Sequence, residues 1–203
     1  MPVARSQRRQ DREIGKSENR PNVLTLLLVL SLAGLSSACL VVSTQPFYDP
    51  SSKEFDEALL GRWEKADDGT LITVERGEWK SYKVSYPARS GPVAYAGYLT
   101  RVGESRVLDL TPAHSVDPAS LLIPAHFAVR LQLLGDTLTA TGFDYDWFLK
   151  EAEQGRLPRV HAVLDGRKNV VLTADTAVLR TWFAALPRGG DMFGDEMRFV
   201  RKP

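Results

Sequence analysis

The chain has 203 residues, with 26 Lys and Arg against 25 Asp and Glu, so its formal net charge is +1. Six of the basic and three of the acidic residues lie within the first 22 positions, which leaves 20 basic and 22 acidic residues in the remainder, a nearly neutral body without a basic run that would bind nucleic acid. The single cysteine, Cys39, excludes an internal disulfide.

The N-terminal segment combines a basic region with an apolar one. After the basic positions comes an uncharged stretch at residues 23–35. This stretch is shorter than the roughly 20 residues that a permanent transmembrane helix needs, so it predicts a signal peptide that is removed. The alternative is a short membrane anchor or an unrelated hydrophobic helix that contains a buried cysteine.

The residues that end this segment are Leu35, Ser36, Ser37, Ala38 and Cys39. They resemble the bacterial lipobox, with Ser36 where that motif usually has a large aliphatic residue. The resemblance implies a signal peptide at residues 1–38, cleavage before Cys39 and lipid on its sulfur. Several acyl chains anchor a protein stably, so we expect a lipoprotein that faces the periplasm or the cell surface. Leu40 follows the cysteine, and the absence of an Asp there favours the outer membrane by the known sorting rules.

The region after Cys39 divides into two parts by composition. Residues 41–50 are rich in Ser, Thr, Gln and Pro, which is typical of an extended linker. We therefore expect the lipidated cysteine and a tether at residues 39–54, followed by a globular domain at residues 55–203 that is long enough for one hydrophobic core.

The globular region is predicted to be mainly β. Apolar residues alternate with polar ones, as in Tyr82, Val84 and Tyr86 or Phe127, Val129 and Leu131, which indicates one buried and one wet face. Turn signals separate successive segments, so we expect antiparallel hairpins. The expected strands lie near residues 60–64, 71–75, 79–86, 93–101, 106–110, 125–134, 137–142, 159–164, 169–172 and 196–200. This number suits an antiparallel barrel or a strongly curved sheet.

Two short helices interrupt this pattern. Asp146 is expected to cap the first, which ends near Gln154, and Thr173 the second, which ends before Pro187. The apolar stripe of the second helix predicts packing on the sheet or across a barrel end.

Gly61, Arg62 and Trp63 on the first long strand resemble the Gly-x-Trp motif of lipocalins and the wider calycin group. The resemblance implies a barrel whose closed end is plugged by Trp63, with Gly61 allowing close approach of the chain. It also implies an arginine over the indole ring, for which Arg198 and Arg201 are candidates and Arg198 is assigned here. The alternative is that Trp63 is an ordinary core aromatic of an unrelated β domain.

A second resemblance covers most of the globular region and is to a group of uncharacterised bacterial lipoproteins. Its segments are Leu59-Leu60-Gly61-Arg62-Trp63, Leu108-Asp109-Leu110, Pro124-Ala125-His126-Phe127, Gly135-Asp136-Thr137-Leu138, Asp146-Trp147 and Leu172-Thr173-Ala174. This resemblance implies no activity.

Signatures of catalysis and of cofactor binding are missing from the sequence. The three histidines, His114, His126 and His161, lack metal-ligand spacing, and no nucleophile elbow or phosphate loop is present. Asp144 and Asp146 form a carboxylate pair, but a helix cap explains Asp146 more simply. We therefore expect no catalytic residue, no metal and no cofactor, and we interpret His126 as a structural strand histidine.

Two functional hypotheses remain. In the first, the barrel binds a small apolar or amphipathic ligand, and Tyr82, Val84, Tyr86, Phe127, Val129 and Leu131 line the site. In the second, the domain is a non-catalytic interaction or assembly module that meets an envelope protein through an open sheet edge or an apolar patch. A continuous cavity would favour the first, and a filled barrel with a bare edge the second.

Overall fold

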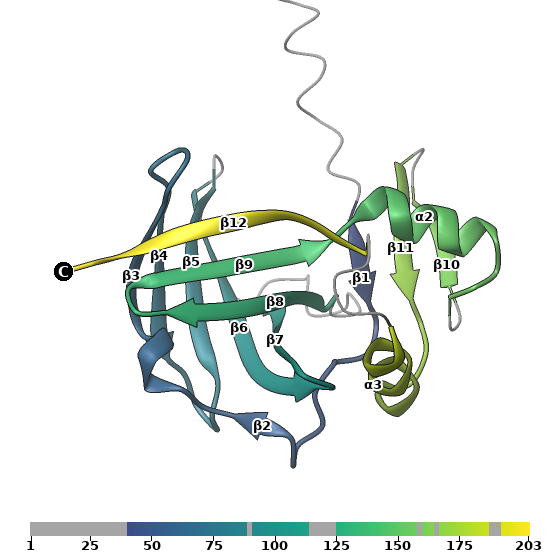
Figure 1. The fold of residues 1–203 in the computed structure, drawn as a ribbon, viewed down its shortest axis with the longest axis horizontal. Helices are drawn as coiled ribbons and strands as arrows, with labels where there is room; N and C mark the ends of the chain where they lie inside the picture. The colour runs from purple at the N-terminus through teal and green to yellow at the C-terminus, as the bar shows by residue number, and fades with distance from the viewer. Residues whose placement is uncertain (1–39, 89–90, 114–124, 158–159, 165–166, 187–191) are drawn as a thin grey trace, which may run out of the picture. The chain divides into compact units, whose positions relative to one another are not determined.

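The computed structural model describes residues 40–88, 91–113, 125–157, 160–164, 167–186 and 192–203. The expected signal peptide, Cys39, His114 and the side chain of His161 lie outside this description. The described residues belong to one compact unit, in which a β barrel lies beside a smaller sheet and two helices (Figure 1).

Within the described residues, eight antiparallel strands close into a barrel. They are β3 (Gly61–Lys65), β4 (Leu71–Arg76), β5 (Tyr82–Ala88), β6 (Gly91–Val102), β7 (Ser105–Pro112), β8 (Phe127–Leu134), β9 (Thr137–Phe143) and β12 (Phe193–Lys202). Strand β12 lies between β3 and β9, and the pairing of β6 with β7 completes the ring. The expectation of a mainly β, lipocalin-like antiparallel barrel is confirmed.

Alternation of side chains explains how these strands form a barrel. On β5, Tyr82 and Val84 are buried while Lys83 between them is exposed, as the period of two requires. Hairpin turns contain glycines in the left-handed region, among them Gly103 with φ +58° and Gly135 with φ +57°, a conformation that other residues adopt at a steric cost.

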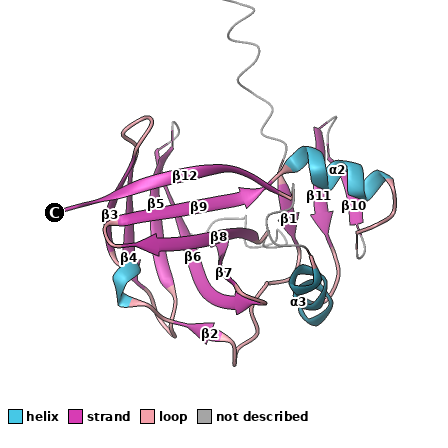
Figure 2. Cartoon of the chain, viewed as in Figure 1, coloured by secondary structure: helices cyan, strands magenta, loops and turns pink. Residues whose placement is uncertain are grey.

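The smaller sheet and the helices complete the folded unit (Figure 2). The remaining elements are β1 (Val41–Ser43), β2 (Lys53–Glu54), the 3-10 helix η1 (Glu57–Leu59), α2 (Tyr145–Glu153), β10 (Val160–Leu164), β11 (Arg167–Leu172) and α3 (Thr176–Ala185). Strand β1 runs parallel to β11, β10 pairs with β11 in the antiparallel sense, and β2 adds to the edge of β6.

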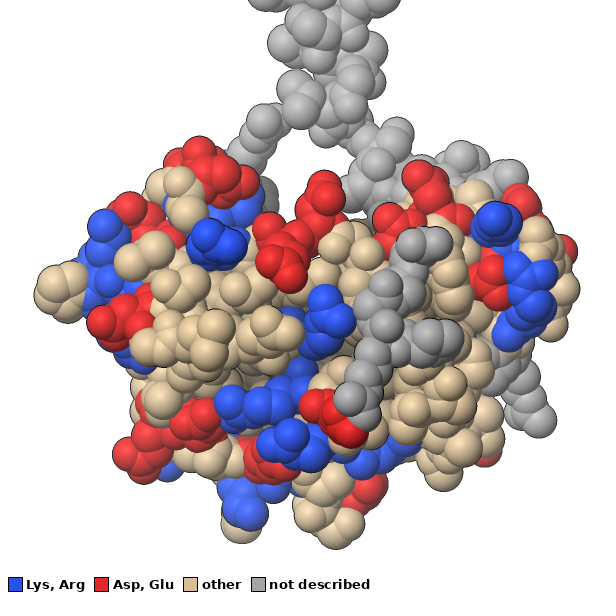
Figure 3. Space-filling view, in the orientation of Figure 1, with Lys and Arg blue, Asp and Glu red and all other residues tan. Residues whose placement is uncertain are grey.

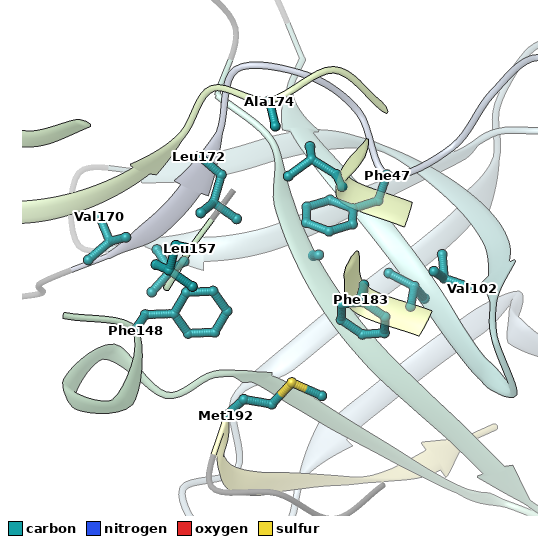
Figure 4. Close-up of a cluster of buried hydrophobic side chains, with 13 residues drawn as sticks. Phe47, Val102, Phe148, Leu157, Val170, Leu172, Ala174, Phe183 and Met192 are labelled. Carbon is teal, nitrogen blue, oxygen red and sulfur yellow. The ribbon is translucent and has the colours of Figure 1, made fainter. Parts of the chain in front are cut away.

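Two hydrophobic clusters stabilise the unit. One lies inside the barrel and includes Trp63 and Tyr82. The other joins the outer face of the barrel to the small sheet and the helices, where Phe47, Phe148 and Phe183 are buried together (Figure 4). The ring centroids of Phe47 and Phe183 are 6.0 Å apart in an edge-on arrangement, a favoured geometry for aromatic pairs.

The segment at 41–54 differs from the expected tether, because it is part of the folded unit. Val41 and Ser43 are buried in β1, whose residues pair with Val170 and Leu172 of β11. Phe47 is only 1% exposed. A segment that looks linker-like by composition is thus held by long-range pairing and by one aromatic side chain.

The starts of both helices also differ in detail from the expectation. The cap of α2 is Asp144, whose carboxylate accepts a hydrogen bond from the backbone N–H of Trp147 at 2.7 Å. Asp146 lies two residues later, in the first turn of the helix, and is exposed. Helix α3 begins after Asp175 rather than after Thr173, and the Asp175 side chain makes no capping hydrogen bond.

The visible face of the unit carries interspersed acidic and basic side chains (Figure 3). Mixed charge of this kind is usual on a solvated surface. None of the helices in the described part of the chain has the length and apolar character needed to traverse a membrane.

Candidate functional site

The interior of the barrel contains an apolar cavity of about 590 Å³. Its volume lies in the range of small-molecule sites, roughly 300 to 1,000 Å³. The residues that line it are Leu40, Leu59, Ile72, Val74, Tyr82, Val84, Tyr86, Tyr95, Leu108, Leu110, Phe127, Val129, Leu131, Leu138, Ala140, Met197 and Phe199. No charged side chain is among them, so the described wall offers hydrocarbon and aromatic surface with three tyrosine hydroxyls.

All six residues that the sequence suggested as ligand-lining lie on this wall: Tyr82, Val84, Tyr86, Phe127, Val129 and Leu131. They come from β5 and β8, and pairing across the sheet places their neighbours on the same face. Val84 is opposite Tyr95 of β6, and Val129 is opposite Leu108 of β7. Residues that pair directly share one face of a sheet, which is why two alternating segments distant in sequence contribute to one surface.

Buried side chains fill one end of the barrel interior. Trp63 is fully buried, and its indole Nε1 donates a hydrogen bond to the backbone oxygen of Leu59 at 3.0 Å. The Cζ atom of Arg201 lies 4.2 Å from the centre of a Trp63 ring, within cation–π distance. The guanidinium also donates to the carbonyl oxygens of Leu60 at 2.8 Å and Ala58 at 2.6 Å.

The arginine over the indole is therefore Arg201, and the assignment of Arg198 to this role is corrected. Arg201 pairs directly with Trp63 across β12 and β3, whereas Arg198 pairs with Thr139 and is exposed. Gly61 has φ +131°, and a Cβ atom there would lie 2.9 Å from Nη1 of Arg201. Glycine at this position leaves room for the guanidinium.

A polar network joins the η1 helix to the same end. Asp56 caps η1 by accepting from the backbone N–H of Ala58 at 2.9 Å, and Nη2 of Arg106 lies 2.7 Å from its carboxylate. The hydrogen bond from Arg106 holds the pKa of Asp56 below its usual 3.8, against the opposing effect of partial burial. The Tyr82 hydroxyl accepts from the backbone N–H of Asp56 at 2.6 Å, and burial raises the pKa of this phenol above 10.0.

The other end of the cavity reaches the surface. Three lining residues are exposed there, with relative exposures of 42% for Leu40, 43% for Tyr86 and 37% for Met197. We call these three residues the apolar rim. They come from the residue before β1, from β5 and from β12, so the rim is assembled from parts of the chain that are far apart in sequence.

A second cleft, of about 790 Å³, lies at the β6–β7 turn and beside the end of α3. Its described lining mixes Arg101, Arg106 and Arg130 with apolar residues, and the Nε atoms of Arg106 and Arg130 are buried without a hydrogen-bond partner. This cleft is larger than the barrel cavity, but it lies at the β6–β7 turn and not inside the barrel. The barrel cavity is the better candidate because one continuous apolar surface surrounds it.

A buried acid–histidine pair lies on the outer face of the barrel, which sequence reasoning missed. Nδ1 of His126 is 2.7 Å from a carboxylate oxygen of Asp109, whose other oxygen accepts from the backbone N–H of Phe47 at 2.6 Å. Asp109 is fully buried and His126 is 7% exposed. The signal was a single carboxylate in the apolar run Val107-Leu108-Asp109-Leu110, because a charge inside such a run needs a buried partner.

The described contacts of this pair connect the barrel to the segment around β1. Ser43 exchanges backbone hydrogen bonds with His126 at 2.9 and 2.8 Å, while its hydroxyl donates to the carbonyl oxygen of Gln45 at 2.6 Å. The hydroxyl is thus engaged by backbone rather than aimed at the imidazole, as a nucleophile would be. The interpretation of His126 as a structural strand histidine agrees with this geometry.

The other residues considered for chemistry do not gather into one site. The Asp144 carboxylate caps α2, and Asp146 lies in the first turn of that helix. Within the described residues, no three His, Cys, Asp or Glu side chains come together as metal ligands would.

Comparison with known proteins does not add a family. No protein-family model, curated protein or solved structure was found to match this chain.

Proposed function

We propose that this chain is a bacterial lipoprotein, anchored by lipid on Cys39, whose barrel holds a small apolar or amphipathic ligand without catalysing a reaction. The observation that carries the ligand proposal is the open cavity of about 590 Å³ with its uncharged wall. The lipobox resemblance supports the anchor, and Leu40 after the cysteine favours the outer membrane.

The chemistry of the wall defines the ligand class. Transfer of apolar surface from water stabilises a complex by about 25 cal/mol per Å², so an uncharged wall favours a hydrocarbon or aromatic group. The Tyr82 hydroxyl is already bonded to the backbone of Asp56. A polar head would therefore lie best at the apolar rim, outside the uncharged wall.

The alternative role, an interaction or assembly module for an envelope protein, has weaker support. A barrel presents an edge for strand addition only where its ring is open, and the pairing of β6 with β7 closes this ring over residues 95 to 112. Among the described residues, β2 adds an edge of two residues, and the small sheet ends at β1 and at β10, which are three and five residues long.

The first test is intact mass spectrometry of the mature chain purified from its native envelope without denaturation, compared with the same sample after delipidation. We expect the lipid on Cys39 to persist as a covalent mass and a second mass to be lost with the extracted ligand. A clean polypeptide-plus-anchor mass at good signal would remove the support for a tightly held ligand.

A matched pair of variants tests where the ligand binds. Val84→Phe projects a larger side chain into the cavity, whereas Lys83→Phe changes the adjacent, exposed residue on the opposite face of β5. We expect Val84→Phe to weaken binding of a fluorescent fatty acid about tenfold, since about 1.4 kcal/mol of lost contact suffices. Lys83→Phe should bind the probe like the parent chain. Equal binding by the parent chain and both variants would mean that the probe binds outside the barrel cavity.

A further inference from the structure

The apolar rim lies at the end of the barrel away from Trp63. At the rim, Leu40, Tyr86 and Met197 are both exposed and continuous with the cavity wall. Exposed apolar side chains at the opening of a cavity favour contact with an apolar partner.

Ion pairs occur at both ends of the barrel. At the rim end, Lys65 lies 2.9 Å from Asp67 and 3.0 Å from Asp68 at the β3–β4 turn. At the closed end, Arg76 lies 2.7 Å from Glu57 of η1, and Arg201 lies 3.2 Å from Asp136 of the β8–β9 turn. Exposed pairs of this kind stay solvated. Trp79 is also exposed at this end, in the turn between β4 and β5, but a single aromatic in a turn is a common surface feature.

The chain enters the fold directly at the rim. The backbone oxygen of Leu40 accepts from Val170 N–H at 3.0 Å, and its N–H donates to the Asn169 side chain at 3.2 Å. Consecutive Cα atoms are only about 3.8 Å apart. Cys39 directly precedes Leu40 in the sequence, so a lipid on Cys39 would be attached one residue from the rim.

From these observations we infer that the apolar rim rests on the lipid bilayer and that the barrel takes its ligand, the acyl chain of a membrane lipid, directly from that bilayer. This inference rests on the proposed function and names its ligand and its source. In this orientation the anchor inserts beside Leu40. The side chains of Tyr86 and Met197 contact the acyl boundary, and the closed end faces water. The acyl chain then passes from one apolar surface to another without crossing water, where each exposed methylene would cost roughly 0.8 kcal/mol.

The orientation is tested by fluorescence quenching with the full mature chain, lipid-bearing at Cys39, in vesicles of phosphatidylcholine brominated in its acyl chains. A Trp79→Phe variant removes the aromatic of the closed end, and Tyr86→Trp in that background places a reporter on the rim. Unbrominated phosphatidylcholine vesicles provide the reference. The fluorescence of the rim tryptophan is the difference between the Trp79→Phe chain with and without Tyr86→Trp, and we expect bromine to lower it at least about twofold. The fluorescence of Trp79 is the difference between the parent and Trp79→Phe, and it should stay unchanged, since quenching needs close contact with the acyl region.

Quenching of Trp79 instead of the rim reporter would overturn the inference, because the closed end would then face the membrane. Absence of quenching at both positions would overturn it as well, since neither end would touch the acyl region.

The transfer step is tested by following a pyrene-labelled fatty acid from phosphatidylcholine vesicles into the barrel. Met197→Asp places a charge on the rim, and Val200→Asp places one on the outward face of the same strand, where the native side chain is exposed to a similar degree. We expect Met197→Asp to slow uptake from vesicles about tenfold, the effect of roughly 1.4 kcal/mol, and Val200→Asp to remain within about twofold of the parent.

Addition of the same fatty acid dispersed in buffer separates the two proposals. If no dispersed probe binds, the proposed function fails, whatever the quenching result. If dispersed probe binds while uptake from vesicles is unaffected by Met197→Asp, the ligand comes from solution and the membrane inference fails alone.

Discussion

At the residue scale, Trp63 and Arg201 show how a short motif is decided by the pleat of a strand. The sequence suggested both Arg198 and Arg201 for the place over the indole, and the structure places Arg201 there. Phe199 is a buried residue of β12, and a period of two puts residue 201, but not residue 198, on its face. The alternation of β12 therefore predicts that Arg201 lies over the indole, which the motif alone does not.

The contribution of Arg201 can be measured against Arg198 as the control. Arg201→Ala removes two hydrogen bonds to backbone carbonyls, a part-buried one to Leu60 and an exposed one to Ala58, and the cation–π contact with Trp63. We expect the free energy of unfolding to fall by about 2 to 3 kcal/mol in urea denaturation, because charge-assisted bonds and the ring contact are lost together. Arg198→Ala, at an exposed position, should change it by less than about 0.5 kcal/mol. Equal effects would contradict the assignment.

At the same scale, His126 and Asp109 illustrate a pairing that sequence spacing cannot supply. Asp109 lies on β7, and His126 directly precedes the neighbouring strand β8. A long connection separates the two residues in the sequence. Their contact depends on the register of β7 with β8, in which Asp109 is opposite Ala128. A lone carboxylate in an apolar strand could have been flagged as needing a partner, but the identity of the partner required the register.

At the element scale, strand β1 shows why composition misjudged residues 41–50. Ser, Thr, Gln and Pro predict an extended segment, and the segment is extended. Its three-residue strand gains stability by pairing with β11, 129 residues later in the chain at Val41 and Val170. Pairing at such a separation leaves no local pattern that a sequence can show.

Phe47 provides the test of this element. It is 1% exposed and contacts the rings of Phe143 and Phe183. We expect Phe47→Ala to lower the free energy of unfolding by about 3 to 5 kcal/mol, as for other buried aromatics. The measurement is urea unfolding followed by far-ultraviolet circular dichroism, with Gln45→Ala, at an exposed position, as the control. A loss below about 1 kcal/mol would mean that residues 41–50 act as a loose linker.

The helix starts belong to the same scale. Both helices were expected from capping residues and apolar spacing, and both are present. The start of α2 moved from Asp146 to Asp144, because the carboxylate of Asp144 reaches the N–H of Trp147. In a run with two candidate caps, only the backbone geometry decides which side chain accepts that bond.

At the scale of the whole molecule, the interior is divided between a packed outer cluster and a barrel that is incompletely filled. A ligand that binds the native cavity stabilises the fold by linkage, by about 2.7 kcal/mol at a concentration one hundred times its Kd. For a chain of this size, that corresponds to a rise in Tm of roughly 5 to 10 °C.

We therefore expect a medium-chain fatty acid to raise the Tm of the parent chain by this amount in differential scanning calorimetry. The Val84→Phe variant should show a smaller rise at the same ligand concentration, and Lys83→Phe should show the full rise. A Tm that does not respond to ligand in any of the three chains would count against a ligand-binding barrel.

The sequence by itself determined the β class, the hairpin order, two helices and the faces of β5 and β8, because alternation and turn residues act between near neighbours. The lipobox resemblance likewise depends on adjacent residues, and cleavage and lipidation at Cys39 stay a prediction. Only the tertiary structure decided that the ring closes through β6 and β7, that its interior is hollow, and that Leu40, Tyr86 and Met197 all line that cavity. Closure and cavity volume depend on strand register and on the summed packing of side chains from every strand, and neither quantity is local in the chain.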